Sequence, residues 1–164
     1  MRNSAAIPDR IMDLPQLVTT VKAWRVKGRT IAFTNGVFDI LHEGHIFSLS
    51  QAAAEADYLV VAINSDASVK RLKGPERPIN SEGSRALLMA SLVMVDAVVV
   101  FGEDTPINVI SAILPDVLVK GGDYSIDQVV GAKEVIAHGG RVVINPLVEG
   151  LSTTNIIQSI RQSG

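Results

Sequence analysis

Apolar runs of strand length alternate with segments of helical period along most of this chain, and that alternation restricts the fold more than any other feature. One run, YLVVAIN at residues 58–64, is apolar almost throughout, as expected of a strand covered on both faces. Strands that alternate with helices form βαβ units around a parallel sheet. We predict strands over residues 30–35, 58–64, 97–101, 116–120 and 141–145.

The segments between these runs predict helices. In the first of them, Leu17, Val21 and Trp24 share one face, and Gly28 follows the last turn. In another, Pro106 falls in the first turn, where its missing N–H costs little. The helices are expected over residues 13–27, 44–56, 81–93, 106–113, 131–137 and 153–161.

The sequence therefore predicts an α/β fold with a doubly wound, Rossmann-like parallel sheet of about five strands. A length of 164 residues suits one domain. Residues 1–28 would form an N-terminal helical segment and residues 29–164 the core. Right-handed crossovers place the ligand crevice of such a sheet beyond the carboxyl ends of its strands.

Composition narrows the function classes. The chain has no cysteine, which excludes a disulfide framework and a thiolate zinc site and fits a cytoplasmic protein. The first 28 residues hold no apolar run typical of a signal peptide, and the longest apolar stretch, residues 92–101, is too short to cross a bilayer. A net charge of −2 argues against a nucleic-acid partner. A local basic cluster can still attract a small anion.

The most informative segment is TNGVFDILHEGH, residues 34–45, where the first predicted strand gives way to a helix. His42 and His45 flank Gly44 at the start of that helix, where unpaired N–H groups and the helix dipole favour anions. Gly36 and Gly44 let a phosphate approach the backbone closely. A single helical histidine is usually structural, but a pair at this junction favours a phosphate site. Glu43 is expected to point outward.

A second basic cluster follows the second predicted strand. Gly74 and Pro78 would shape a loop there that brings Lys73 over a polyphosphate, where an ammonium group neutralises developing charge. A solvated charged face is the alternative for such a run. The cluster spans residues 66–85, and its basic members are Lys70, Arg71, Lys73, Arg77 and Arg85.

Two further segments end at the same edge of the predicted sheet. Lys120 and Gly121 close the fourth strand, and Asp123 follows; the alternative is a glycine turn with a capping aspartate. Residues 149–155 precede the last helix, and their hydroxyl groups suit either a second anion site or ordinary helix capping. Those hydroxyl residues are Ser152, Thr153 and Thr154.

At residues 34–45 the chain resembles the HxGH nucleotidyltransferases. With the later blocks INSDASVKRLKG, ERPIN, EDTP, ILPDVLVKGGDY, AKEV and LSTTNII, in order as far as residue 157, it resembles the D-glycero-β-D-manno-heptose 1-phosphate adenylyltransferases. That family includes the adenylyltransferase half of a bifunctional heptose kinase/adenylyltransferase. The resemblance implies an enzyme that joins AMP from ATP to heptose 1-phosphate for ADP-heptose and lipopolysaccharide synthesis, here expected in its stand-alone form.

The resemblance also implies roles for individual residues. His42, His45 and Lys73 would stabilise charge as the α-phosphorus is attacked, and Mg²⁺ would bind mainly through the ATP phosphates, with Asp39 either assisting it or orienting a phosphate-binding residue. The chain is expected to supply no dedicated metal ligands. It is expected to form a homodimer. Nucleotide binding is assigned to Thr34, Asn35, Gly36, Phe38, Asp39, Gly44, Lys120, Gly121, Ser152, Thr153 and Thr154. Sugar-phosphate binding is assigned to Asn64, Asp66, Arg77, Arg85 and Asp123. For Arg77 and Arg85, binding of the triphosphate is the alternative.

Two other functions fit the same residues. A cytidylyltransferase acting on glycerol or ethanolamine phosphate would use the same reactive loop, because base choice depends on contacts elsewhere. A nucleotide-binding module without catalysis would bind ATP but release no pyrophosphate. Its expected signature is a broken histidine pair or a missing Lys73, and the sequence has neither.

Overall fold

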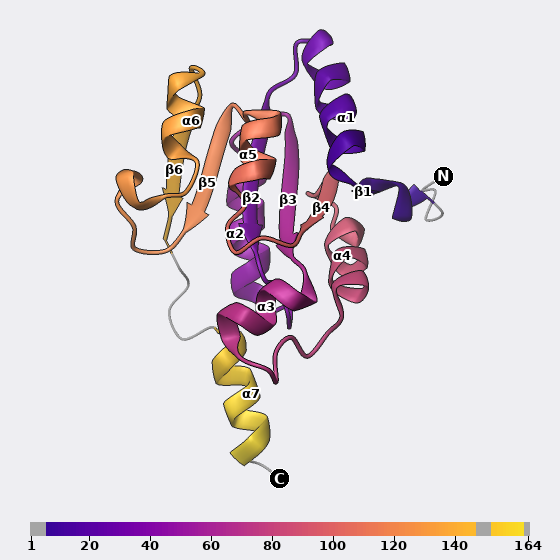
Figure 1. Cartoon of the computed structure of the whole chain (residues 1–164), viewed down its shortest axis with the longest axis vertical. Coiled ribbons are helices and arrows are strands. Elements are labelled where there is room, and N and C mark those ends of the chain that lie inside the picture. Colours follow the sequence, from indigo (N-terminus) through magenta and orange to yellow (C-terminus); the bar gives the residue numbers. More distant parts are fainter. Residues whose placement is uncertain (1–5, 147–151, 163–164) are drawn as a thin grey trace.

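A parallel six-stranded sheet forms the centre of the computed structural model, which describes residues 6–146 and 152–162 (Figure 1). Every neighbouring pair of strands in it is parallel. The strand order is β1-β4-β3-β2-β5-β6. The strands are β1 (Ile11–Met12), β2 (Ile31–Gly36), β3 (Tyr58–Asn64), β4 (Ala97–Phe101), β5 (Val117–Gly121) and β6 (Arg141–Asn145).

The predicted doubly wound α/β fold is confirmed, and every predicted strand and helix is present with bounds shifted by a few residues. The described chain also holds two short 3₁₀ turns, Pro8–Arg10 and Ile126–Gln128. None of its helices combines the length and apolar character needed to cross a membrane. The helices are α1 (Leu14–Val26), α2 (Glu43–Ala53), α3 (Asp66–Lys73), α4 (Glu82–Ser91), α5 (Ile107–Ile113), α6 (Ala132–Ala137) and α7 (Thr153–Gln162).

Two elements were not predicted. Strand β1 has only two residues, too few to show a period, and it adds a sixth strand to the expected five. Helix α3 replaces part of the loop expected after the second strand. It has only eight residues, its sequence is strongly charged and it buries only Ser68 and Val69, so no apolar run marks it. The N-cap Ser65, which accepts from the Ser68 N–H, was its clear signal.

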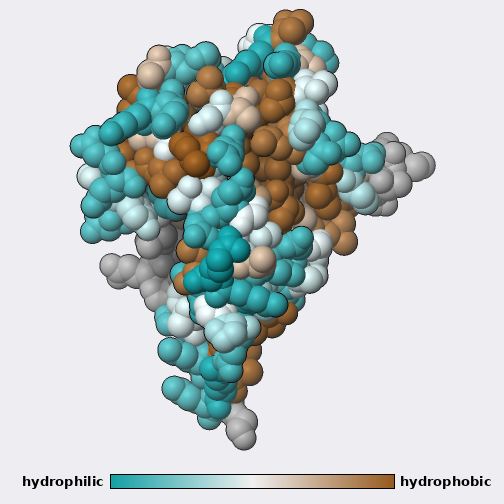
Figure 2. Space-filling model, in the orientation of Figure 1, coloured by the Kyte–Doolittle hydropathy of each residue, from teal (hydrophilic) through white to brown (hydrophobic). Residues whose placement is uncertain are grey.

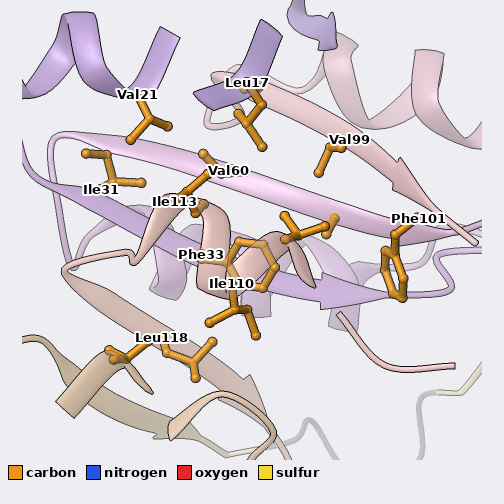
Figure 3. Close-up of a cluster of buried hydrophobic side chains, with 14 of the residues drawn as sticks. Leu17, Val21, Ile31, Phe33, Val60, Val99, Phe101, Ile110, Ile113 and Leu118 are labelled. Atoms are coloured by element: carbon orange, nitrogen blue, oxygen red, sulfur yellow. The ribbon is translucent and has the colours of Figure 1, made fainter. Parts of the chain in front are cut away.

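Helices cover the sheet on both faces. On one face α1, α5 and α6 pack over side chains such as Phe33, which is fully buried and lies beside Ile110 of α5 (Figure 3). On the other face α2 and α4 pack over the alternate residues, Ala32 of β2 among them. The strands are therefore apolar on both sides, which explains why their sequences are continuous apolar runs.

The strand order reverses between β2 and β5. These two neighbours pair through Ala32 with Val117 and Phe33 with Leu118. The carboxylate of Asp116 fixes their start by accepting a hydrogen bond of 2.8 Å from the Ile31 N–H. Beyond their carboxyl ends the connections leave toward opposite faces, which opens the crevice where ligands bind in this fold.

The N-terminal segment packs against the body of the domain. Asp13 caps α1 through a capping box with Gln16. Trp24 stacks on Tyr58 at the start of β3, with ring centroids 4.2 Å apart. Arg10 donates to the carbonyl oxygen of Val95 at 2.8 Å. The contacts of Trp24 and Arg10 attach the segment to the amino ends of β3 and β4.

Phe33 provides a test of this core. Replacing Phe33 with alanine should lower the free energy of unfolding by about 3–5 kcal/mol, because the cavity left between β2 and α5 has no exposed side from which to collapse. Urea denaturation measures the change. Phe47→Ala, at a phenylalanine 41% exposed on α2, is the control and should cost less than about 1 kcal/mol. Equal losses would contradict the packing described.

Candidate active site

A cavity of about 400 Å³ lies at the carboxyl ends of β2 and β5, bounded also by the start of α2, the end of α3 and the start of α7. It gathers all the residues predicted to bind the nucleotide, the three predicted catalytic residues and Arg77. It also contains three residues that were not predicted, Val37, Ser48 and Pro146. Ser48 follows His45 by three positions, so helical spacing alone places both on one face.

The two histidines of the cavity stack on each other. His42 is the N-cap of α2, and its ring centroid lies 3.8 Å from that of His45 at an interplanar angle of 26°. Phe38 meets the His45 ring edge-on at 5.3 Å. Within the described residues, the Nδ1 atoms of both histidines are buried without a hydrogen-bond partner. The rings are therefore held by packing, and Glu43 between them is exposed as predicted.

His45 is poised in its neutral form. Burial, and secondarily the nearby charge of His42, lower the pKa of His45 to about 4. At neutral pH its imidazole therefore supplies one N–H donor and no charge. An anion bound beside it would favour the charged form and raise that pKa.

Gly36 leaves room for the ring of Phe38. A Cβ built at Gly36 would lie 2.9 Å from the nearest ring atom of Phe38, closer than real side chains approach. Phe38 itself adopts a left-handed backbone, with φ of 49°, which is unusual for a bulky residue. The glycine predicted for its access to phosphate thus also lets Phe38 fold back against the strand and pack on His45.

Asp39 connects the loop of residues 77–80 to the histidine loop, residues 37–42 between β2 and α2. Its buried carboxylate accepts hydrogen bonds from the backbone N–H groups of Ile79 and Asn80 at 2.8–2.9 Å and from Nε of Arg77 at 2.8 Å. Burial by itself would raise the pKa of Asp39, but these donors outweigh it and hold the pKa below its usual value. Of the two roles predicted for Asp39, this geometry favours orienting Arg77.

Arg85 has a structural role, in contrast to the predicted one. Its side chain is completely buried and donates to the carbonyl oxygens of Asn80 and Val37, at 3.0 and 2.7 Å, and to the carboxylate of Asp66 at 2.8 Å. A guanidinium without exposed surface has no face for a sugar phosphate. Arg85 instead joins α4 to α3 and to the histidine loop, and Asp66 is its partner in that role.

Two more residues assigned to the sugar phosphate lie outside the cavity lining. Asn64 is buried and donates to Ser68 Oγ, which in turn donates to the carbonyl oxygen of Glu103, so this amide positions the start of α3. Asp123 is exposed beyond the end of β5. Of the five residues assigned to the sugar phosphate, the cavity lining includes Arg77.

Two lysines and one threonine complete the cavity wall. Lys73 is the exposed last residue of α3, which Gly74 ends at φ of 100°. Lys120 is half-buried and its desolvation lowers its pKa. Thr153 donates through Oγ1 to the carbonyl oxygen of Ile40 at 3.3 Å, which joins the start of α7 to the histidine loop. Residues 149–151 of the predicted anion site lie outside the described residues.

Residues 33–159 match the family described as cytidylyltransferase-like. The chain belongs to the cytidylyltransferase-like family. The "Bifunctional protein HldE" of Paramagnetospirillum magneticum is 55% identical over 151 residues, 92% of this chain and 31% of that protein. That of Azotobacter vinelandii is 54% identical over 152 residues, 93% of this chain and 32% of the relative. The chain thus spans about a third of the length of these curated relatives.

Solved structures agree with this family. The lipopolysaccharide core biosynthesis protein of Thermoplasma volcanium is 31% identical, with a TM-score of 0.60 over 73% of this chain and 97% of that one. A pantoate-beta-alanine ligase from Francisella tularensis shares the fold at 16% identity and a TM-score of 0.58, covering 92% of this chain and 76% of the ligase. The resemblance to the nucleotidyltransferases seen in the sequence is confirmed.

Asp39→Asn tests the loop attachment. An amide oxygen accepts hydrogen bonds from the three N–H donors more weakly than the carboxylate does. The free energy of unfolding at pH 7 should therefore fall by on the order of 3 kcal/mol. Because the folded-state pKa of Asp39 is depressed, its contribution is complete above the unfolded value of 3.8 and is lost as the pH falls through the lower folded pKa. Urea denaturation should therefore show the two proteins converging below pH 3.8. A constant difference would contradict the role.

NMR titration tests the environment of His45. We expect its imidazole to titrate near pH 4, with the resonance assigned from a His45→Asn protein. The linked contribution to stability is present above the unfolded value of 6.5 and is lost as the pH falls from 6.5 toward about 4, since the unfolded chain takes up the proton first. A midpoint at 6 or higher would show that the ring is solvated.

Proposed function

We propose that the chain transfers AMP from ATP to D-glycero-β-D-manno-heptose 1-phosphate, giving ADP-heptose and pyrophosphate for bacterial lipopolysaccharide and other surface glycans. The observation that carries this proposal is the stacked His42–His45 pair at the amino end of α2, facing one cavity with Lys73. Membership of the cytidylyltransferase-like family and the similarity to HldE proteins support a sugar-phosphate nucleotidyltransferase. The choice of heptose 1-phosphate as the substrate comes from the sequence blocks that resemble the heptose 1-phosphate adenylyltransferases.

The reaction is a direct displacement. A phosphate oxygen of heptose 1-phosphate forms a bond to the α-phosphorus of ATP while the bond from that phosphorus to the bridging oxygen breaks, and pyrophosphate leaves with the electron pair. The attacking group is already an anion and needs no general base. Catalysis then consists of positioning and of stabilising charge on the phosphoryl oxygens. His42, His45 and Lys73 are placed to donate to those oxygens.

Magnesium enters this reaction as part of the MgATP substrate. The Asp39 carboxylate is engaged by Arg77, Ile79 and Asn80. Phosphate oxygens and water would therefore complete the shell of the ion, while the chain supplies N–H donors and ammonium groups around the polyphosphate.

A pyrophosphate-release assay tests the proposal. Release from MgATP should depend on heptose 1β-phosphate and exceed release from MgCTP. His45→Ala should lower turnover by on the order of 10²–10³, the usual cost of removing one preorganised donor. His138→Ala is the matched control, because His138 is an exposed histidine outside the cavity, and its turnover should match the wild type.

Other outcomes have distinct meanings. A preference for CTP with glycerol or ethanolamine phosphate would keep the chemistry and overturn the adenylyltransferase assignment. Tight ATP binding with no release of pyrophosphate, with heptose 1β-phosphate present, would make the chain a nucleotide-binding module. Equal losses in His45→Ala and His138→Ala would remove the histidine pair from the mechanism.

A further inference from the structure

A groove of about 410 Å³ adjoins the cavity and runs between the loop of residues 74–79 and helix α7. The two hollows share Lys73, Arg77 and Thr154 in their linings. Figure 1 shows α7 extending from this end of the sheet, and Figure 2 shows largely hydrophilic surface over α3 and along one flank of α7. The groove therefore continues the candidate active site along α7, with a lining that combines polar and apolar residues.

The shared end of the groove suits a phosphate. Arg77 donates through Nε to Asp39, so its guanidinium is fixed, and in the described residues neither of its terminal nitrogens forms a hydrogen bond. Lys73, which also lines both hollows, adds an ammonium group to the same opening. The chain as a whole carries a net charge of −2, so this pair is a local exception that favours an anion.

The far end of the groove suits a polyhydroxyl group. Glu76 on the loop and Arg161 on α7 face each other across it, with 2.6 Å between Oε2 and Nη2. Gln158 lies one turn before Arg161 on the same helix and adds both a donor and an acceptor. Ile157 supplies apolar surface for the carbon face of a ring.

The length of the groove matches a sugar rather than a short alcohol. Thr154 at the shared end and Arg161 at the far end are seven residues apart on α7, which is about 10 Å along a helix. A glycerol or ethanolamine phosphate bound at the shared end would fill only part of this length. A sugar ring that carries additional carbons would fill more of it.

We infer that this groove is the acceptor subsite: Lys73 and Arg77 hold the phosphate of the sugar 1-phosphate, and Glu76 and Gln158 hydrogen-bond the hydroxyl groups of its sugar. The inference rests on the proposed function for the reaction, and it adds Glu76 and Gln158, which the sequence analysis did not single out, to Lys73 and Arg77. ATP then occupies the neighbouring cavity. The α-phosphate of ATP and the phosphate of the sugar meet where the two hollows join.

Gln158→Leu tests the subsite while preserving helix α7 and its charge. Binding of heptose 1β-phosphate in the absence of ATP, measured by calorimetry, should weaken about tenfold, and the KM for this substrate should rise by a similar factor. The KM for ATP should stay within about twofold. Gln162→Leu makes the same change one turn farther along α7, outside the groove lining, and should leave both constants unchanged.

Glu76→Gln provides a second variant with its own control. It should also raise the KM for heptose 1β-phosphate, because an amide accepts more weakly from a sugar hydroxyl than a carboxylate does. Glu55→Gln is the match, since Glu55 accepts from Arg141 at the same 2.6 Å at a site outside both hollows. Equal effects of the two glutamate variants would reduce Glu76 to a surface ion pair and overturn its role.

The outcomes separate the subsite from the reaction. Sugar-phosphate binding that Gln158→Leu leaves unchanged would overturn the subsite, even where the wild type makes ADP-heptose. Binding weakened by Gln158→Leu would support the subsite, even where no pyrophosphate is released and the proposed function fails. An equal rise in the KM values for ATP and for heptose 1β-phosphate would show that Gln158 only supports α7, and would overturn the inference.

Discussion

The reversal of strand order between β2 and β5 is the constraint on which the rest of this molecule depends. The two strands are neighbours, yet the chain leaves them toward helices on opposite faces of the sheet, α2 on one and α6 on the other. No helix can cover the edge where the connections part, so a crevice is left beside the N-terminus of α2. His42 and His45 reach that crevice from the segment that follows β2, and Lys120 reaches it from the carboxyl end of β5.

Buried polar groups then hold the irregular segments around the crevice in one arrangement. Asp39 and Arg85 both act from the interior, one through its carboxylate and the other through its guanidinium, and both contact the segment at Asn80. Arg77 gains its position in this way and contributes its remaining donors to the cavity. The loops around the candidate active site are thus held in place by buried charged groups.

The sequence predicted the layers of the fold and most of the cavity, and its failures have physical causes. The apolar runs identified five strands because burial on both faces requires such runs, whereas the two residues of β1 carry no period. The histidine loop directly follows β2, and the hydroxyl residues Ser152, Thr153 and Thr154 lie at the start of α7. Sequence order alone places both segments there. Arg85 was misassigned because a guanidinium in a basic cluster gives no sign of whether it is buried; only the packing of α4 against α3 and the histidine loop shows that its charge is used internally.

Helix α7 buries none of its residues, and this has a thermodynamic consequence. Its described attachments include one hydrogen bond from Thr153 to Ile40 and an exposed ion pair between Arg161 and Glu76. Such a helix opens at a small fraction of the free energy needed to unfold the sheet. Because α7 lines both the cavity and the groove, whichever of the two proposed substrates binds first would contribute to ordering it, and the second would bind a helix already in place. The two substrates are thereby expected to bind with positive cooperativity even without a change in the fold of the sheet.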